Sequence, residues 1–451
     1  MSIQKSLQKI IKMIKERDTN LEEFFQNLHP SDFAEIVDDL TDEQKAELFD
    51  LLSDEEAAMV IQEMEELDQV VLFQLLTKKR ASAILKEMAS DDAADLLSEL
   101  PENEARELLT LIDEDAEELR GLMKYPEDTA GGIMTTEYIA FPENMTVEEA
   151  IRRLREIAPE AETVYYVYVV TEEMQVSGVL SLRELIASAD GTKLAEIMRK
   201  SLISVPVDMD QEEVARLVSK YDLLAVPVVD ERQRLLGIVT VDDILDVLEE
   251  EATEDMYRRV GAAELESVDL VSASVPSILG RRLPWLIITL IGGLFVGSVI
   301  AVFEEALEAV AALVFFIPVI MDMGGNVATQ SSTVFVRGVA TGEISVEERW
   351  GYFLREIRIG VLMGVICGST VAVAASLWQA EPMLGLVVGI AMSATVTVAA
   401  IIGTLIPLVF SQLGIDPAYA SGPLVTTIKD ASGLLIYFSI AVRLLPELVN
   451  L

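Results

Sequence analysis

Charged and apolar residues are distributed so unevenly along this chain that it divides into two unlike parts near Arg281. The 451 residues include 76 acidic and 34 basic ones, but residues 281–451 hold only 12 of the acidic and 8 of the basic residues. The formal net charge of −42 is therefore concentrated in the part before Arg281. Since dense like charge requires water and long apolar segments favour lipid, we expect an acidic, water-exposed body joined to a membrane body.

Five segments of the second part are long and apolar enough to cross the hydrocarbon core of a bilayer, which takes about 20 residues. Arginines precede the first segment and crowd the connection between the second and the third, whereas the turns at Glu304 and Glu381 carry no basic residue. Because basic residues stay on the cytoplasmic side, this pattern predicts a multi-pass protein of the plasma or inner membrane, with a cytoplasmic N-terminal body and with Leu451 outside. The predicted spans are residues 283–303, 309–336, 359–380, 383–413 and 423–442.

Three charged residues, Asp322, Lys429 and Asp430, fall inside these spans. Charges at membrane depth are costly and are therefore functional candidates. The polar, glycine-containing run 324–332 predicts a break in the second span, and hydroxyl residues cluster before Asp430 at the start of the fifth. Irregular backbone and clustered hydroxyls are tolerated in a membrane where they line a wet cavity, so we interpret Asp322 and Asp430 as parts of a cation pathway.

Two plainer interpretations of the same residues stay open. Glycine and hydroxyl residues in membrane helices can serve only as close-packing surfaces. Lys429 could also neutralise Asp430, although adjacent positions on a helix point about 100° apart and do not face each other.

The chain offers few ligand types for a metal ion. Cys367 is the single cysteine and His29 the single histidine, which excludes an intrachain disulfide framework and a cysteine-rich zinc site. His29 is interpreted as a helix-start residue. A bound metal ion would need oxygen ligands, which suit hard ions such as Mg²⁺, Ca²⁺ or Mn²⁺.

The acidic part repeats itself between residues 29 and 123 with a period of about 11 to 13 residues. Each repeat starts with Ser, Thr, Asp or Pro, continues with acids and ends in apolar residues at helical spacing. The starts at Thr41 and Ser53, followed by Gln44 and Glu56, have the form of a capping box, and a further start is predicted at Ser90. The pattern predicts a superhelical stack of short helices.

A second, longer repeat follows, in which residues 145–152 align with 209–216 and residues 178–185 with 237–244. Each unit predicts the order helix, strand, strand, helix, and a tandem pair of such units resembles the CBS-domain pair, a regulatory module. The pair ends in a long polar helix, 241–255, with eight carboxylates in fifteen residues. A divalent cation that bridges carboxylates from two domains or subunits would relieve their repulsion, and its loss would drive them apart.

The order of these parts resembles the MgtE family of magnesium channels and transporters across essentially the whole chain. The most specific stretches are residues 324–330, residues 423–427 with Asp430, and residues 237–243 leading into 251–255. The resemblance implies a homodimer with the pore on its two-fold axis, a lipid bilayer and divalent cations as partners, no nucleic-acid partner, and gating by intracellular Mg²⁺. The implied fold is multi-domain: an all-α superhelical N-terminal domain (1–130), an α/β tandem CBS domain pair (131–196 and 197–250), a connecting plug helix (251–280) and an α-helical transmembrane domain of five helices (281–451).

The resemblance also assigns site residues. The family's pore carboxylate falls on Asp430, and the pore lining falls on Asn326, Gly325, Thr426 and Thr329. Asp322 departs from the family, in which members need no carboxylate there, and we expect it to add a second charged position to the pore. The regulatory Mg²⁺ ligands fall on Asp91, Asp95, Glu212, Asp222, Asp243, Asp246, Glu251, Glu254 and Asp255.

The chain departs from the family pattern in two places. Thr329 and Gly422 stand where some members carry Asn, so hydroxyl and backbone oxygens would replace side-chain amides in the pore. Members that bind ATP in the CBS pair use an Arg-Asp pair and an aromatic residue, whereas Arg183-Glu184 and Leu223 stand at those positions. The resemblance implies Mg²⁺ as both the transported and the regulatory ion, whereas the second departure disfavours ATP.

We expect passive entry of Mg²⁺ down its gradient, with Asp430 binding the hydrated ion and with Mg²⁺ at the acidic interface closing the pore. A coupled secondary transporter of Mg²⁺, Co²⁺ or Mn²⁺ is an alternative, and a membrane-anchored CBS sensor is a weaker one because it would not need acids inside the spans. An enzyme is the weakest possibility, since the sequence has no phosphate-cradling glycine loop, no nucleophile elbow and no paired base.

Overall fold

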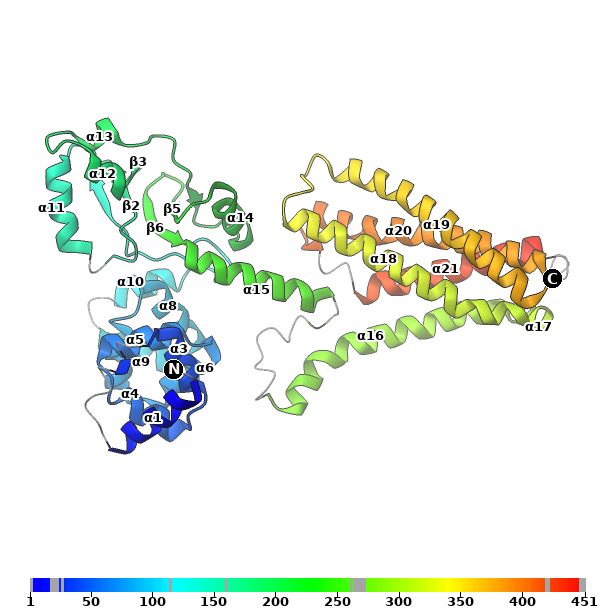
Figure 1. Cartoon of the computed structure of the whole chain (residues 1–451), viewed down its shortest axis with the longest axis horizontal. Coiled ribbons are helices and arrows are strands. Elements are labelled where there is room, and N and C mark those ends of the chain that lie inside the picture. Colours follow the sequence, from blue (N-terminus) through cyan, green and yellow to red (C-terminus); the bar gives the residue numbers. More distant parts are fainter. Residues whose placement is uncertain are drawn as a thin grey trace. The chain divides into compact units, whose positions relative to one another are not determined.

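A computed structural model describes residues 3–16, 24–25, 28–112, 116–158, 161–259, 262, 273–417 and 422–445 (Figure 1). The chain forms two compact units, Met1–Leu248 and Glu249–Leu451. The first unit contains a helical domain followed by a tandem α/β domain, and the second contains the apolar helices. The predicted multi-domain fold class is thereby confirmed. Leu451 and residues 260–261 and 263–272 of the predicted connecting helix 251–280 lie outside the described residues.

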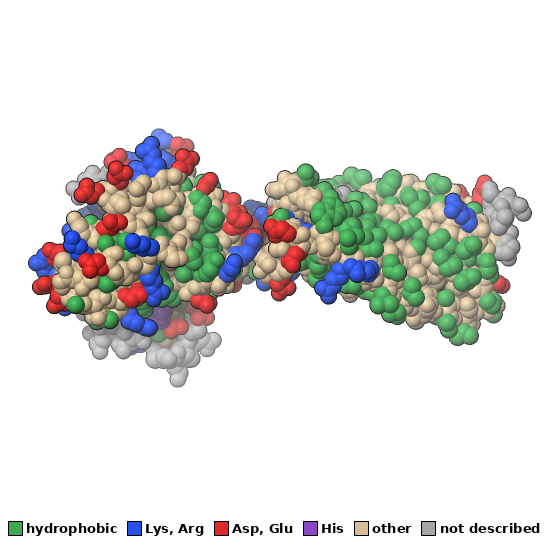
Figure 2. All heavy atoms as spheres, turned by 90° about the horizontal axis from the view of Figure 1, so that it is seen from above, with side chains coloured by type: hydrophobic (Ala, Val, Ile, Leu, Met, Phe, Trp, Pro, Cys, Tyr) green, Lys and Arg blue, Asp and Glu red, His purple; other side chains and the backbone are tan. Residues whose placement is uncertain are grey.

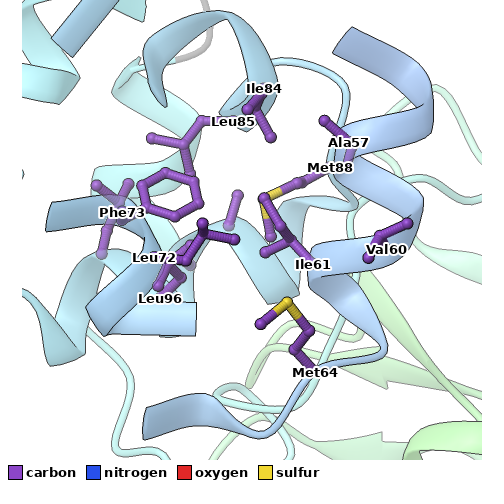
Figure 3. Close-up of a cluster of buried hydrophobic side chains, with 14 of the residues drawn as sticks. Ala57, Val60, Ile61, Met64, Leu72, Phe73, Ile84, Leu85, Met88 and Leu96 are labelled. Atoms are coloured by element: carbon purple, nitrogen blue, oxygen red, sulfur yellow. The ribbon is translucent and has the colours of Figure 1, made fainter. Parts of the chain in front are cut away.

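The helical domain consists of short helices that pack mainly against the helix two positions further along the chain, as α3 does with α5, α5 with α7, and α6 with α8. Their apolar side chains meet in one core, and Figure 3 shows Ile61, Leu72, Phe73 and Leu85 pointing toward one another from three successive helices. The helices are α1 (Ile3–Glu16), α3 (Pro30–Asp38), α4 (Asp42–Phe49), α5 (Asp54–Gln62), α6 (Glu66–Leu75), α7 (Lys78–Leu85), α8 (Ser90–Glu99), α9 (Glu102–Ile112) and α10 (Ala116–Leu122).

The two predicted capping boxes are confirmed. The Thr41 hydroxyl accepts from the Gln44 amide N–H at 3.4 Å, while the Gln44 side chain accepts from the Thr41 N–H at 3.1 Å. Ser53 and Glu56 form the same reciprocal pair at 3.1 and 2.9 Å. Such caps satisfy amides that have no partner inside the helix and each stabilises by about 1 kcal/mol.

The predicted helix start at Ser90 is confirmed, since α8 begins at that residue. Ala89 is the residue before α8 and offers no side-chain cap, and Ser90 is buried at the first helical position. Its hydroxyl accepts from the Thr136 amide N–H at 3.0 Å and lies 2.9 Å from the Thr136 hydroxyl. Ser90 therefore ties the start of α8 to the segment that enters the tandem domain.

The tandem domain contains two three-stranded sheets with the orders β1-β2-β3 and β4-β5-β6. In each sheet the first pair is parallel and the second antiparallel. The predicted order helix, strand, strand, helix is confirmed in both units, but β1 and β4 were not predicted, because strands this short have too few residues for a periodic pattern. The elements are β1 (Ala140–Pro142), α11 (Val147–Ile157), β2 (Tyr166–Val170), β3 (Val176–Ser181), α12 (Leu182–Ala187), α13 (Leu194–Ile197), β4 (Val205–Pro206), α14 (Gln211–Tyr221), β5 (Ala225–Val229), β6 (Leu235–Thr240) and α15 (Val241–Arg259).

Two equivalent glycines, Gly178 and Gly237, allow the segment that precedes each repeat to pair with a strand of the other repeat. Thr135 and Ile238 donate and accept reciprocally at 2.9 Å, and Val179 and Arg199 do the same at 3.0 and 3.1 Å. A Cβ on Gly237 would lie 2.6 Å from the Thr135 carbonyl oxygen, which is closer than a side chain allows. Gly178 meets the Arg199 carbonyl oxygen in the same way at 2.8 Å, so the matching glycines of the sequence repeat mark two matching backbone crossings.

The second unit contains five helices that are long and apolar enough to cross a membrane, which confirms the predicted number of spans among the described residues. Figure 2 shows apolar side chains spread over much of the surface of this helical unit, as contact with lipid requires. The elements are α16 (Val275–Val302), α17 (Glu304–Ala309), the 3₁₀ turn η3 (Ala311–Phe316), α18 (Ile317–Ala340), α19 (Arg349–Gln379), α20 (Pro382–Gln412) and α21 (Pro423–Leu444).

Helices α19 and α20 form the most extensive helix pair of this unit, and small residues allow their backbones to approach. Gly360, Gly364 and Gly368 recur every four residues on α19 and face α20. The Ser393 hydroxyl of α20 donates to the Gly364 carbonyl oxygen at 2.8 Å, and the Thr397 hydroxyl approaches the Gly360 carbonyl oxygen at 3.5 Å.

Gly364→Ala should therefore lower the thermal unfolding midpoint of the detergent-solubilised protein. A Cβ there would lie 2.5 Å from the Ser393 carbonyl oxygen, and such overpacking costs about 1–3 kcal/mol. Gly351→Ala is the matched control, because it is the same substitution on the same helix with no atom within 4 Å, and alanine favours the helix. Equal midpoints for the two variants would contradict the close α19–α20 approach.

Candidate functional site

One candidate site in the first unit is an acidic cluster formed by α8 and the first turns of α15. Asp91, Asp92 and Asp95 lie on α8, and their carboxylates repel Asp243 and Asp246 of α15. The bonds between Ser90 and Thr136 hold the start of α8 against the tandem domain, so the sequence-distant halves of the cluster meet. The structure thus brings together four of the predicted Mg²⁺ ligands: Asp91, Asp95, Asp243 and Asp246.

The carboxylates of this cluster bind protons more tightly than free carboxylates. Burial and the Asp92 and Glu66 charges raise the pKa of Asp95 to about 8. Burial also raises the pKa of Asp243 to about 6, against the lowering effect of hydrogen bonds that its carboxylate accepts from the Thr240 hydroxyl and N–H at 2.5 and 3.2 Å. Burial raises the pKa of Asp91 well above its usual range, and Asp91 Oδ1 has no hydrogen-bond partner. A cation at this place would replace protons and relieve repulsion.

A small cavity with the volume of about two water molecules lies beside the cluster. Its volume is about 70 Å³, while one water takes about 30 Å³ of liquid. In the described part of the chain, no three His, Cys, Asp or Glu side chains are grouped closely enough to hold a bare metal ion. Mg²⁺ gives up its water reluctantly, so a Mg²⁺ ion would contact these carboxylates partly through water. The residues that line the cavity are Glu66, Gln69, Asp92, Asp95, Leu96 and Glu99.

Some of these residues were not predicted from the sequence. Asp92 could have been found, because it lies three positions before Asp95 and so shares its helix face. Glu99 lies four positions after Asp95 and shares the same helix face, whereas Glu66 comes from α6, and no sequence spacing places it beside α8.

The other predicted Mg²⁺ ligands lie elsewhere. Glu212 stands in the first turn of α14, 3.2 Å from Arg216, and Asp222 is the exposed, left-handed residue at the other end of that helix. Ten residues of helix separate them by about 15 Å, so they do not share an ion within one chain. The last three, Glu251, Glu254 and Asp255, are half-buried on the part of α15 that belongs to the second unit.

Within the second unit, α15 is joined to the connection before α21. Arg258 forms ion pairs with Glu254, one turn earlier on α15, and with Asp416, which lies between α20 and α21. All three side chains are largely shielded from water, which strengthens the pairs relative to exposed ones. The acidic helix therefore contacts the segment that leads into the helix of Asp430.

The second candidate site is a polar stripe along the membrane helix α18. Asp322, Asn326, Thr329 and Gln330 are all exposed and recur at helical spacing, so they share one face. The Asn326 amide donates to Asp322 at 3.1 Å. Exposed carboxylate and amide groups at membrane depth need water or another protein surface, because lipid offers them no partner.

The predicted break in this span is wrong. Helix α18 runs without interruption from Ile317 to Ala340 across Gly324 and Gly325. Two glycines weaken a helix by about 1 kcal/mol each, but in a membrane an unsatisfied backbone group costs several kcal/mol, so the hydrogen-bond ladder continues. The glycines serve close packing, since a Cβ on Gly325 would lie 2.8 Å from Lys429 Nζ.

Asp430 and Thr426 lie one helical turn apart on α21, which packs against α16, α18 and α20. Lys429 and Asp430 do form an ion pair, with Nζ 2.5 Å from Oδ1, so the geometric argument against their pairing is wrong. The long lysine side chain bends back although the two Cβ positions diverge. Asp430 Oδ1 nevertheless makes no hydrogen bond, so the contact is one of charge without directional bonding.

A larger cavity of about 440 Å³ lies between the two repeats of the tandem domain. Tyr165, Tyr166 and Tyr168, at and next to β2, line part of this cavity. The sequence pattern of ATP-binding members does not point to these aromatic residues. Arg199 at its edge is held by Glu184, with nitrogen and carboxylate oxygen 2.7 Å apart. The prediction that this chain disfavours ATP stays a prediction.

Comparisons with known proteins agree with this architecture. Three family profiles match in order: the MgtE intracellular N domain over residues 28–128, the CBS domain over residues 130–191 and 194–250, and the divalent cation transporter MgtE over residues 317–440. The chain is 44% identical to the magnesium transporter MgtE of Thermus thermophilus over 332 residues, which are 74% of this chain and 73% of that protein. It is 40% identical to the magnesium transporter MgtE of Bacillus subtilis over the same shares of the two chains.

Two solved structures resemble the water-exposed part. The soluble part of a magnesium transporter is 37% identical and matches with a TM-score of 0.53, covering 56% of this chain and all of that one. The cytosolic domain of the Mg²⁺ channel MgtE, solved with ATP, is 43% identical with a TM-score of 0.51, covering 53% of this chain and 99% of that one. The matches define a multi-pass membrane transporter with CBS domains. The chain belongs to the MgtE family of divalent cation transporters, and its relatives are transporters rather than enzymes.

The acidic cluster predicts how the stability of the water-exposed part, residues 1–259, depends on pH. Because the pKa of Asp95 is raised from 3.8 to about 8 on folding, the native state binds more protons than the unfolded state between these values. The free energy of unfolding should therefore fall as pH rises from 5 to 8, by about 2 kcal/mol once solvent screening of the half-buried groups is allowed for. Denaturant titrations at both pH values measure it.

Mg²⁺ should restore the stability lost at pH 8, because the cation takes the place of the protons. The control is Asp95→Asn, which should flatten the pH dependence. Stability that rises between pH 5 and 8 without Mg²⁺ would show that the cluster is not repulsive.

Proposed function

We propose that this protein carries Mg²⁺ across the cytoplasmic membrane through a pore on the two-fold axis of a homodimer. The observation that carries the proposal is the exposed polar stripe of α18 together with Thr426 and Asp430 of α21. A single chain would turn the α18 stripe and Thr426 toward lipid, which is costly, whereas the Asp430 side chain is only 15% exposed and lies beside Lys429. In a symmetric dimer the same stripe of the second copy would lie opposite the first, so that the polar groups of both copies would surround water.

The proposed ion path joins oxygen ligands of several kinds. Asp430 supplies charge, Asn326 and Gly325 supply amide and backbone oxygens, and Thr426 and Thr329 supply hydroxyls, with Asp322 as a second charged position. Mg²⁺ holds its water shell tightly, so Asp430 attracts the ion through water. Attraction without direct coordination lets the ion leave again, as conduction requires, and the negative cell interior drives entry.

The acidic cluster is the proposed sensor of Mg²⁺ on the cytoplasmic side. The raised pKa values of Asp95 and Asp243 support this role, because they record repulsion that a divalent cation would remove. Mg²⁺ would hold α15 against α8, and its loss would free α15. The ion pairs of Arg258 with Glu254 and Asp416 then supply a route from α15 to α21. Glu212, Asp222, Glu251 and Asp255 are proposed as further ligands at contacts between domains or subunits.

Asp430→Asn should reduce Mg²⁺ flux into vesicles more than tenfold while folded protein is still recovered, because the variant keeps the shape of the side chain and loses its charge. Flux is measured with a Mg²⁺ indicator, with the full chain reconstituted and without any opposing ion gradient. Glu304→Gln, in the α17 turn, is the control and should transport normally. Normal flux through Asp430→Asn would refute the pore assignment, and flux that needs an opposing Na⁺ or H⁺ gradient would favour a coupled transporter.

A variant in which four acids are changed together to their amides should still transport Mg²⁺ but should be less inhibited by Mg²⁺ on the cytoplasmic side. The four acids are Asp243, Asp246, Glu251 and Glu254. The half-inhibiting Mg²⁺ concentration should rise about tenfold or more. The reason is that the sensor loses the charge that holds its ion. Flux is followed while Mg²⁺ on the cytoplasmic face is varied. The exposed acids Glu148 and Glu156 of α11, changed to Gln, serve as control. Inhibition that is the same in both variants would place the sensor elsewhere.

A further inference from the structure

We propose that Lys429 is a built-in counter-ion of Asp430 that an incoming cation must displace, and that it sets the affinity of the ion path and its preference for divalent ions. The proposal rests on the proposed role of Asp430 in that path. It concerns a residue that neither the family comparison nor the pore prediction assigns.

The ammonium group of Lys429 occupies a defined seat between α21 and α18. The residue is 8% exposed, its Nζ lies 2.5 Å from Asp430 Oδ1, and it donates to the Met321 carbonyl oxygen at 2.9 Å. Gly325 forms the wall of this seat, since a Cβ on that residue would stand 2.8 Å from Nζ. The absence of a side chain at Gly325 therefore makes room for the charge.

The two partners of the ammonium group differ in kind, since one is a backbone carbonyl and the other is a negative charge for which a cation can compete. The Met321 carbonyl belongs to a continuous helix and offers its second lone pair, so it stays in place whatever happens at Asp430. Asp430 Oδ1 is close to Nζ but makes no hydrogen bond. The ammonium group thus has one fixed partner and one that it can release, and a buried ammonium group without any partner would be costly.

Displacement of this ammonium group favours divalent ions on simple electrostatic grounds. Asp430 and Lys429 together form a neutral pair, so a cation that binds the carboxylate must compete with the +1 charge of the ammonium group. The attraction of an ion to the carboxylate is proportional to the charge of the ion, so Mg²⁺ gains about twice as much as Na⁺ or K⁺ at equal distance. The same competition weakens the hold on Mg²⁺ and prevents a deep trap.

Lys429→Met tests the proposal, because methionine fills similar space without charge. In vesicles that contain the full chain, the half-saturating Mg²⁺ concentration for flux should fall about tenfold or more, and Na⁺ at 100-fold excess over Mg²⁺ should now inhibit the flux. A purely structural role for Lys429 predicts less folded protein with an unchanged half-saturating concentration and no Na⁺ inhibition. That result would overturn the proposal.

A pair of glycine variants provides an independent test that leaves the lysine in place. Gly325→Ala should push the ammonium group from its seat and shift half-saturation and Na⁺ inhibition in the same direction as Lys429→Met. Gly324→Ala is the matched control, because its Cβ would meet Thr395 Cγ2 at 3.4 Å and Lys429 Cδ at 3.9 Å, which are ordinary contacts. If Lys429→Met fails to fold, the two alanine variants test the proposal on their own. Equal half-saturating Mg²⁺ concentrations in Gly325→Ala and Gly324→Ala would overturn it.

The Asp430→Asn experiment separates failure of this proposal from failure of the proposed function. Loss of flux in Asp430→Asn together with unchanged half-saturation in Lys429→Met rejects the counter-ion role and keeps the pore assignment. Normal flux in Asp430→Asn rejects both.

Discussion

The interaction on which the rest of the structure depends is the repulsion between carboxylates that packing forces together. Asp91, Asp92 and Asp95 approach Asp243 and Asp246 although burial and like charge both oppose it. The approach is imposed by other contacts, namely the apolar core of the short helices and the bonds between Ser90 and Thr136. Because these contacts hold the acids in place, the cluster stores a repulsion that protons or cations can relieve, and it is this property that a sensor of divalent ions needs.

The same constraint acts more strongly in the membrane, where water is scarce. Polar groups there are either enclosed, as Lys429 is against the Met321 carbonyl, or left exposed along α18, where a second surface must cover them. Glycines make both arrangements possible by bringing backbones and charges close together. The missing side chain at Gly364 leaves space for Ser393 between α19 and α20. The missing side chain at Gly325 leaves space for the Lys429 ammonium group between α18 and α21.

Much of the fold could be predicted because its signals are local. The caps at Thr41 and Ser53, the five apolar spans and the tandem repeat with Gly178 and Gly237 depend on neighbouring residues or on a fixed period. The errors arose where a distant partner decided the outcome. The run at Gly324 suggested a broken helix, but the lipid environment keeps its hydrogen bonds intact. The adjacent positions of Lys429 and Asp430 argued against an ion pair, but the Met321 carbonyl of α18 holds the ammonium group beside the carboxylate. Strands β1 and β4 were too short to show a period.

The sequence by itself determined the acidic and apolar halves, the number of spans, the repeat architecture and the presence of Asp430 at membrane depth, because hydrophobic length, periodicity and charge are properties of contiguous residues. Only the tertiary structure decided which acids face one another across α8 and α15, that Glu66 shares a cavity with Asp95, and that the Lys429 ammonium group binds the Met321 carbonyl of α18. These relations depend on distances between segments that are far apart in the chain. Helix packing sets such distances, and no local pattern encodes them.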